Sequence, residues 1–164
     1  MKKTHIIIHH SLVSYTKNPS QFEAIERYHA GKGWGKGTGY NFVIEKDGLR
    51  ENGRSLSTLG AHCYQQGMNR KSIGICLSGD FDIEEPTREQ CESLLKLILE
   101  LQEAHGIPDE NVELHRDYAT YKSCPGNLIP DNILNGAEDL YFIAFDTAVI
   151  RPFGEQNGGV ILNC

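Results

Sequence analysis

The sequence has no cluster of basic residues and no long hydrophobic run, and these absences exclude two classes of protein. The formal net charge is -6 for 164 residues, so the chain lacks the positive surface that nucleic-acid binding requires. No apolar stretch approaches the roughly 20 residues that span a bilayer, so we expect no membrane insertion. The apolar run at 6–8 is also shorter than the core of a signal peptide. We therefore expect the protein to reside in the cytoplasm after synthesis.

Paired cysteines are missing as well. The chain has five cysteines, and no two of them form a CxxC motif. They are Cys63, Cys76, Cys91, Cys124 and Cys164. An odd number of cysteines without an export signal argues against a disulfide framework. Any functional cysteine is therefore expected to act alone or with residues of another type.

What the sequence does contain is a mixture of short apolar segments and amphipathic ones. Segments 4–10, 72–79 and 111–115 are short and apolar, with polar or glycine boundaries, which predicts strands. Residues 40–45 begin a hairpin that turns at Asp47-Gly48. Helices are expected over 20–31, with Ser20 and Glu23 as a capping box, and over 87–106, with Thr87 and Gln90. The predicted fold is α/β, with a central mixed β-sheet flanked by helices.

The C-terminal part of the chain has a different pattern. A short helix is expected near 128–140, followed by two apolar segments separated by Pro152 and Gly154. We therefore predict one domain over 1–140 and a C-terminal extension over 141–164. The extension is interpreted as a β-hairpin of the same domain, or as a mobile or oligomer-forming segment. We otherwise expect a monomer.

Two histidines and a cysteine stand where a metal site would form. His9 lies near the end of the first predicted strand, His115 at the end of a later one, and Cys124 in the loop that follows. Strand ends share one rim of an α/β sheet, where sites usually lie. Three protein ligands leave zinc a fourth position for water, which is typical of catalytic zinc. His10 is an alternative to His9 because neighbouring strand residues face opposite sides.

Four blocks of sequence carry a more specific signal. They are "IIIHHS", "GKGWGKGTGYNFVIEKDG", "GAHCYQQGMNRKSIGICLSG" and "LHRDYATYKSCPG". In this order they resemble the zinc-dependent N-acetylmuramoyl-L-alanine amidases of the peptidoglycan-recognition-protein fold, particularly small bacteriophage endolysins. The resemblance covers about residues 4 to 135. It implies a zinc enzyme that hydrolyses the amide between N-acetylmuramic acid and L-alanine in peptidoglycan.

The resemblance also implies roles for individual residues. His9, His115 and Cys124 match the zinc ligands, and Tyr40 and Lys122 match residues that stabilise the transition state. Two further residues, His62 and Asn69, match positions that line the substrate groove.

The sequence departs from the family pattern at two places. The segment "YATYKS" before Cys124 has an extra residue, which either bulges harmlessly or displaces Lys122. Some relatives have glutamate, proposed as a general base, where this chain has Cys76. The phage-type branch also lacks that glutamate, so the interpretation favours an endolysin, a bacteriolytic enzyme held in the cytoplasm until it reaches the cell wall.

Other functions fit parts of the pattern. A non-catalytic peptidoglycan-binding protein would share the fold, although such receptors typically lose a metal ligand. A cytoplasmic amidase that recycles soluble muropeptides would share the chemistry. A cysteine peptidase would use Cys124 or Cys76 with a histidine base, and a structural zinc site would need a fourth ligand such as His10 or His62.

Overall fold

The computed structural model describes residues 1–15, 17, 20–35, 37–129 and 131. The predicted helix near 128–140 falls mostly outside the described residues, and the 141–164 extension falls wholly outside them. The strands are β1 (His5–His10), β2 (Phe42–Ile44), β3 (Arg50–Asn52), β4 (Ser72–Leu77) and β5 (Val112–Leu114). The α-helices are α1 (Phe22–Gly31), α2 (Met68–Lys71), α3 (Arg88–His105) and α4 (His115–Tyr118). Two short 3-10 helices cover Gln65–Gly67 and Asp109–Asn111.

Among the described residues the five strands form one mixed sheet, as the sequence predicted, and their order in the sheet is β3-β2-β4-β1-β5. Only the hairpin pair β2 and β3 is antiparallel. The two strands richest in isoleucine, β1 and β4, occupy central positions and are almost wholly buried. Strands buried on both faces are apolar throughout their length, which is why the runs "III" and "SIGICL" could be recognised without alternation.

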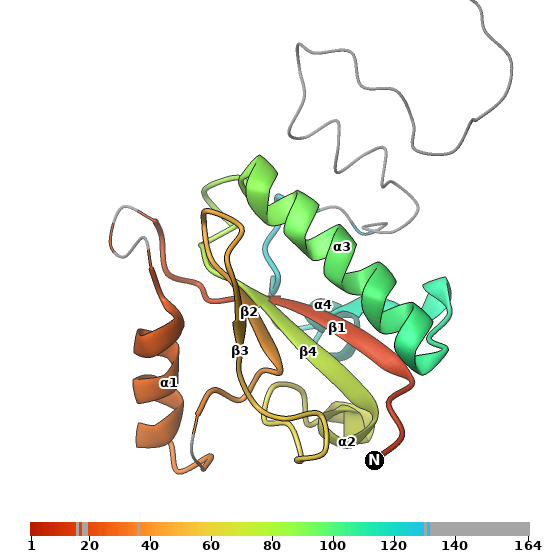
Figure 1. Ribbon diagram of the computed structural model, residues 1–164. Helices are drawn as coiled ribbons and strands as arrows, with labels where there is room; N and C mark the ends of the chain where they lie inside the picture. Colours follow the sequence, from red (N-terminus) through yellow and green to blue (C-terminus); the bar gives the residue numbers. More distant parts are fainter. Residues whose placement is uncertain (16, 18–19, 36, 130, 132–164) are drawn as a thin grey trace, which may run out of the picture.

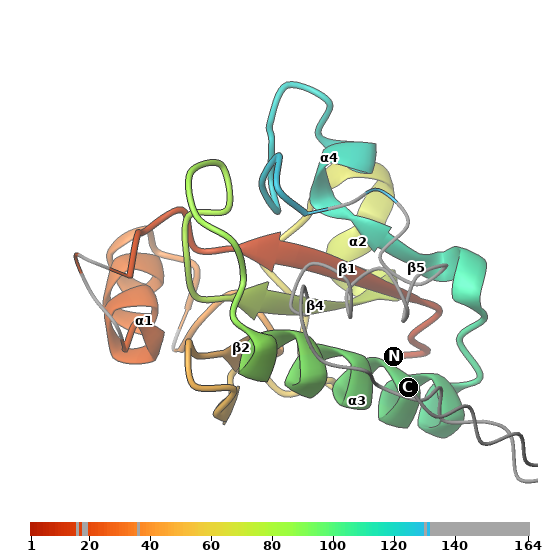
Figure 2. The ribbon, with the colours of Figure 1, turned by 90° about the horizontal axis from the view of Figure 1, so that it is seen from above.

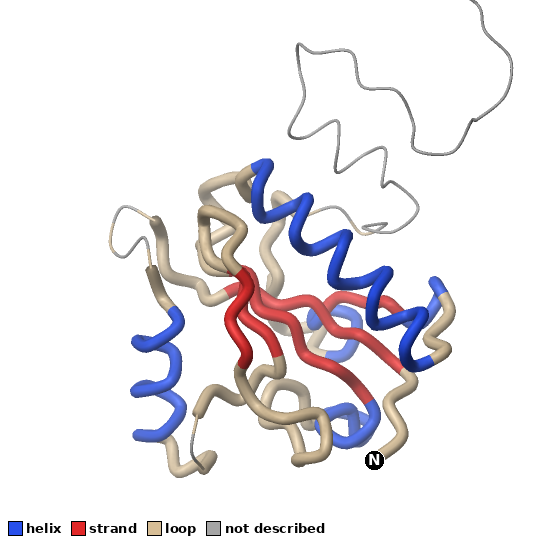
Figure 3. The backbone as a smooth tube through the Cα atoms, in the orientation of Figure 1, coloured by secondary structure: helices blue, strands red, loops and turns tan. Residues whose placement is uncertain are grey.

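Helices cover both faces of the sheet, so the domain has three layers. The long helix α3 crosses one face, and α1, α2 and α4 lie on the other (Figures 1 and 2). Figure 3 shows the twisted sheet between these layers. The α3 side of the sheet holds the larger apolar core, to which α3 contributes Cys91, Leu94, Leu97, Ile98 and Leu101. The functional residues therefore have to lie at the rim or on the face opposite α3.

The alternation of side chains along β1 decides where its two histidines point. Ile6 and Ile8 belong to the core under α3, whereas Ile7 packs on the opposite side with Met68. His9 follows the side of Ile7, and His10 follows the side of Ile8, where its ring lies 6.1 Å from that of Phe81. The two candidates are therefore on different faces.

Of the two predicted helix caps, one is present in the structure and the other is not. The Thr87–Gln90 capping box at the start of α3 is confirmed. The Ser20 cap is wrong, because α1 begins after Gln21 and has no side-chain cap from its own segment. Instead, the buried carboxylate of Glu45 accepts hydrogen bonds from the backbone N–H groups of Gln21 and Phe22, at 2.8 and 2.6 Å. A negative charge at a helix N-terminus also stabilises the helix dipole.

Candidate metal centre

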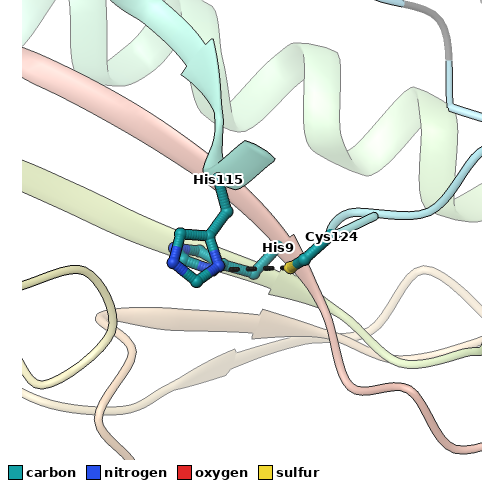
Figure 4. Close-up of side chains that lie close together, drawn as sticks. All are labelled: His9, His115 and Cys124. Atoms are coloured by element: carbon teal, nitrogen blue, oxygen red, sulfur yellow. Dashed lines mark hydrogen bonds between the residues drawn. The ribbon is translucent and has the colours of Figure 1, made fainter. Parts of the chain in front are cut away.

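Three elements bring together His9, His115 and Cys124. His9 is the penultimate residue of β1, and His115 opens α4 directly after the neighbouring strand β5. Cys124 reaches the same place from the loop that follows α4. One ligand atom from each residue can be chosen so that all lie within 4.8 Å of one another. Figure 4 shows the three side chains converging, with Cys124 Sγ 3.8 Å from Nδ1 of His9.

A backbone hydrogen bond and one arginine fix the loop that carries Cys124. The N–H of Arg116 donates to the carbonyl of Cys124 at 2.7 Å, which ties the residue after His115 to the cysteine itself. The Arg116 guanidinium donates to the carbonyls of Gly126 and Ile129, at 2.7 and 2.6 Å. It also contacts the carboxylate of Asp131. The separation of His115 and Cys124 is therefore set by Arg116.

We expect Arg116→Ala to lower the free energy of unfolding by about 2–3 kcal/mol, because partly buried carbonyls lose charged donors. Metal affinity should fall as well, since the Cys124 loop loses its anchor. Urea denaturation would measure the first effect. The control is Arg27→Ala, which removes an exposed ion pair to Glu23 and should change stability by less than about 0.5 kcal/mol. Equal effects in the two variants would contradict the anchoring role.

Burial keeps the two histidines of this cluster, and the neighbouring His62, neutral. Desolvation, with the nearby His115 charge second, holds the pKa of His9 well below its ordinary value. Desolvation, with Lys122 second, lowers the pKa of His115 to about 4. Desolvation is also the main reason why the pKa of His62 is lowered to about 3. Neutral imidazole is the form that binds a metal ion.

These shifts predict how the stability of the metal-free protein depends on pH. Histidines in the unfolded chain take up protons near pH 6.5, whereas the folded protein resists protonation until the lower pKa values are reached. The unfolded state then binds more protons, so stability is complete above pH 6.5 and falls as the pH is lowered through it. We expect a loss of about 1 kcal/mol per histidine by pH 5.5, measured by urea denaturation in a chelator. A flat profile would contradict the burial of these rings.

Cys124 is a mostly buried thiol with one donor directed at its sulfur. Burial raises its pKa to about 11, while a hydrogen bond from the backbone N–H of His10 and the charge of Lys122 act in the opposite direction. Such a thiol is protonated near neutral pH unless a cation replaces the proton. The sulfur, with two neutral imidazoles, is the donor set that zinc prefers.

Tyr40 closes one side of the cluster. Its ring centroid lies 5.1 Å from that of His9, and its hydroxyl is hydrogen-bonded to the thiol of Cys76. Burial raises the pKa of Tyr40 well above the ordinary value, so the phenol remains a proton donor. Cys76 is fully buried in β4, where it pairs with His9 of the neighbouring strand β1. It is both a core residue and the partner of Tyr40, a contact that no local sequence pattern could reveal.

Lys122 lies on the exposed side of the cluster. Its backbone N–H donates to the carbonyl of Ala119 at 2.8 Å, so the chain turns between these residues, and Cys124 reaches His9. The positive charge of Lys122 is near enough to lower the pKa values of His9, His115 and Cys124.

His62 and Asn69 lie beside the cluster, and each has contacts within the protein. Nδ1 of His62 is 3.0 Å from Nε2 of His9. Oδ1 of Asn69 accepts from the backbone N–H groups of His62 and Cys63, each at 2.8 Å. Their substrate-binding roles stay predictions, and His62 has a closer relation to His9 than the sequence indicated.

Comparison with protein families identifies this fold and site. Residues 1–127 match the family model described as N-acetylmuramoyl-L-alanine amidase. The chain belongs to this amidase family. The endolysin of Enterobacteria phage T3 is 33% identical over 125 residues, covering 73% of this chain and 78% of the endolysin. The endolysin of Escherichia phage T7 is 35% identical over 101 residues, covering 58% of this chain and 64% of that protein.

Solved structures show the same relationship. The N-acetylmuramoyl-L-alanine amidase LysC from Clostridium intestinale superposes with a TM-score of 0.70 at 29% identity, covering 87% of this chain and 85% of LysC. A tyrosine-to-phenylalanine mutant of Drosophila PGRP-LB, solved in complex with tracheal cytotoxin, gives 0.65 at 28% identity, covering 77% and 76%. The predicted fold and enzyme class are thus confirmed: the protein is an N-acetylmuramoyl-L-alanine amidase with endolysin-like relatives. Among the described residues, no helix is long and apolar enough to cross a membrane.

Proposed function

We propose that this amidase is zinc-dependent and cleaves the bond between N-acetylmuramic acid and L-alanine in the manner of an endolysin. The observation that carries the proposal is the convergence of His9, His115 and Cys124 within 4.8 Å. Two imidazoles and a thiol suit zinc better than magnesium or calcium, which prefer oxygen ligands. When bound there, zinc would supply Lewis acidity toward a carbonyl and a water whose pKa is near 7.

The residues around the cluster have separate tasks in the proposed reaction. Tyr40 keeps its proton and can donate a hydrogen bond to the oxygen on which negative charge develops. The exposed ammonium of Lys122 stabilises that charge from the solvent side. The chain presents Cys76 rather than a carboxylate behind Tyr40, so β4 supplies no general base at this point. Proton transfer to the departing amine therefore falls to water and the donors Tyr40 and Lys122.

Hydrolysis adds water across one amide. The lactyl group of muramic acid becomes a carboxylate, and the stem peptide leaves with a free amino group on L-alanine. The substrate class is peptidoglycan or its muropeptides, and the endolysin-like relatives favour intact wall. A protein of this kind acts on the wall after it leaves the cytoplasm.

Mass spectrometry of purified peptidoglycan after digestion tests the proposal. We expect new peptides with N-terminal L-alanine, their loss in a chelator, and their return with added Zn²⁺. Digestion that is insensitive to chelation but stopped by thiol alkylation would instead indicate a cysteine peptidase. Binding to the wall without cleavage would indicate a receptor. Parallel digestion of soluble muropeptides separates a wall-lytic enzyme from a recycling amidase.

A further inference from the structure

The imidazole of His62 occupies a slot that two glycines leave open. A Cβ atom on Gly74, in the central strand β4, would lie 2.6 Å from Cγ of His62. A Cβ atom on Gly60 would lie 2.8 Å from its Cδ2 and 3.0 Å from its Nε2. Contacts this short are not possible, so both positions must lack a side chain for the ring to fit. The backbone at Gly60 and Gly74 therefore packs directly against the ring and restricts its movement.

Hydrogen bonds to Asn69 fix the backbone on both sides of His62. Oδ1 of Asn69 accepts from the N–H groups of His62 and Cys63, and the carbonyl of Asn69 accepts from the N–H of Gly60 at 2.9 Å. Asn69 therefore binds the backbone of the His62 loop both before and after the histidine. Asn69 has a clear structural task in fixing His62.

His62 is directed at one nitrogen of His9. The two rings are nearly perpendicular, at 86°, and Nδ1 of His62 lies 3.0 Å from Nε2 of His9. The other ring nitrogen of His9, Nδ1, faces Sγ of Cys124. Nδ1 of His9 is therefore the atom that points into the ligand cluster, and Nε2 points away from it.

We propose that His62 is a positioning residue that fixes the tautomer of His9 for metal binding. A neutral imidazole carries one proton, so a His9 whose Nδ1 lone pair is free must carry its proton on Nε2. His62 Nδ1 then accepts that proton in a hydrogen bond, and the proton of His62 lies on its own Nε2. Partners of this kind orient metal-binding histidines and raise metal affinity. The inference rests on the proposed zinc site.

The surroundings of His62 fit this arrangement. Its Nε2 is buried against Gly60 and has no hydrogen-bond partner among the described residues. A buried nitrogen without a partner costs free energy, so the fold accepts this cost to place Nδ1 against His9. The opposite arrangement, with His62 donating to Nε2 of His9, would leave a proton on Nδ1 of His9 and block the metal.

A matched pair of variants tests the role. His62→Asn keeps an acceptor near the position of Nδ1, and His62→Leu has a similar shape without one. Asparagine and leucine both branch at Cγ and have similar shapes, so the two variants differ mainly in the hydrogen-bonding atoms of the side chain. Zn²⁺ affinity, measured by competition with a chromophoric chelator, should fall about 10–100-fold in His62→Leu and stay near wild type in His62→Asn. Equal affinities in the two variants would overturn the proposal.

Two further measurements separate this inference from the zinc site itself. Gly74→Ala, whose added Cβ would meet the His62 ring first, should displace that ring and also weaken Zn²⁺ binding. In the wild-type protein, long-range ¹H–¹⁵N spectra with Zn²⁺ should show His9 protonated on Nε2; protonation on Nδ1 would overturn the inference. A wild-type protein that binds no Zn²⁺ would overturn the zinc site and the role of His62 together. Zn²⁺ binding unchanged by His62→Leu would overturn the role of His62 alone.

Discussion

Replacing Cys124 by serine is expected to remove zinc from the protein and to lower amide hydrolysis by at least about 10³-fold. The metal contributes several kcal/mol of charge stabilisation to such a reaction, and about 4 kcal/mol corresponds to that factor. A serine hydroxyl at the same place is a poor substitute for a thiolate, which is the form of cysteine that binds metal. Zinc content by atomic spectroscopy and release of peptides from purified wall would measure the two effects.

A second cysteine provides the matched control. Cys91 is buried in α3 under the opposite face of the sheet. Cys91→Ser makes the same thiol-to-hydroxyl change and should lower stability by about 1–3 kcal/mol while leaving zinc content intact. If Cys91→Ser lost zinc as completely as Cys124→Ser, general destabilisation would explain both results.

The aspartate variant separates a metal ligand from a nucleophile. Carboxylates are established zinc ligands, so Cys124→Asp should retain zinc and a measurable part of the activity. A thiol nucleophile at this position would lose all activity in the same variant. Activity with zinc in Cys124→Asp would therefore exclude the peptidase reading, and its absence with zinc still bound would favour that reading.

The parts of the fold that could be predicted are those set by residues close together in the sequence. The isoleucine run of β1, the run "SIGICL" of β4 and the Thr87–Gln90 cap are local signals, and all three are present in the structure. The cap of α1 was not predictable, because its carboxylate comes from Glu45, a residue of another segment. Long-range hydrogen bonds of this kind leave no trace in the sequence near the helix.

The site shows the same limit. The alternation along β1 established that His9 and His10 face opposite sides, but only the position of α3 shows which side holds the cluster. One feature of the sequence indicated the slot for His62, namely the glycine within the buried strand "SIGICL". Glycine in a strand interior often marks a close approach by another group. Which group approaches could be read only from the fold.

Lys122→Ala is expected to keep zinc and to lose about 10²–10³-fold in turnover. The structure places the lysine charge where it lowers the pKa values of His9 and His115, although no ligand bond depends on it. Removing a cation beside a metal site should leave zinc affinity equal or slightly higher. Removing one donor that stabilises developing negative charge typically gives the stated loss of rate.

An exposed lysine elsewhere isolates the effect of Lys122. Lys46 lies over the ring of Tyr15 at 4.7 Å, much as Lys122 lies over that of Tyr121 at 5.8 Å. Lys46→Ala therefore removes the same kind of surface contact away from the cluster, and its turnover should match wild type. Lys122→Arg keeps the charge and should retain more activity than Lys122→Ala. Wild-type turnover in Lys122→Ala with full zinc content would show that the "YATYKS" turn holds this lysine away from the reacting amide.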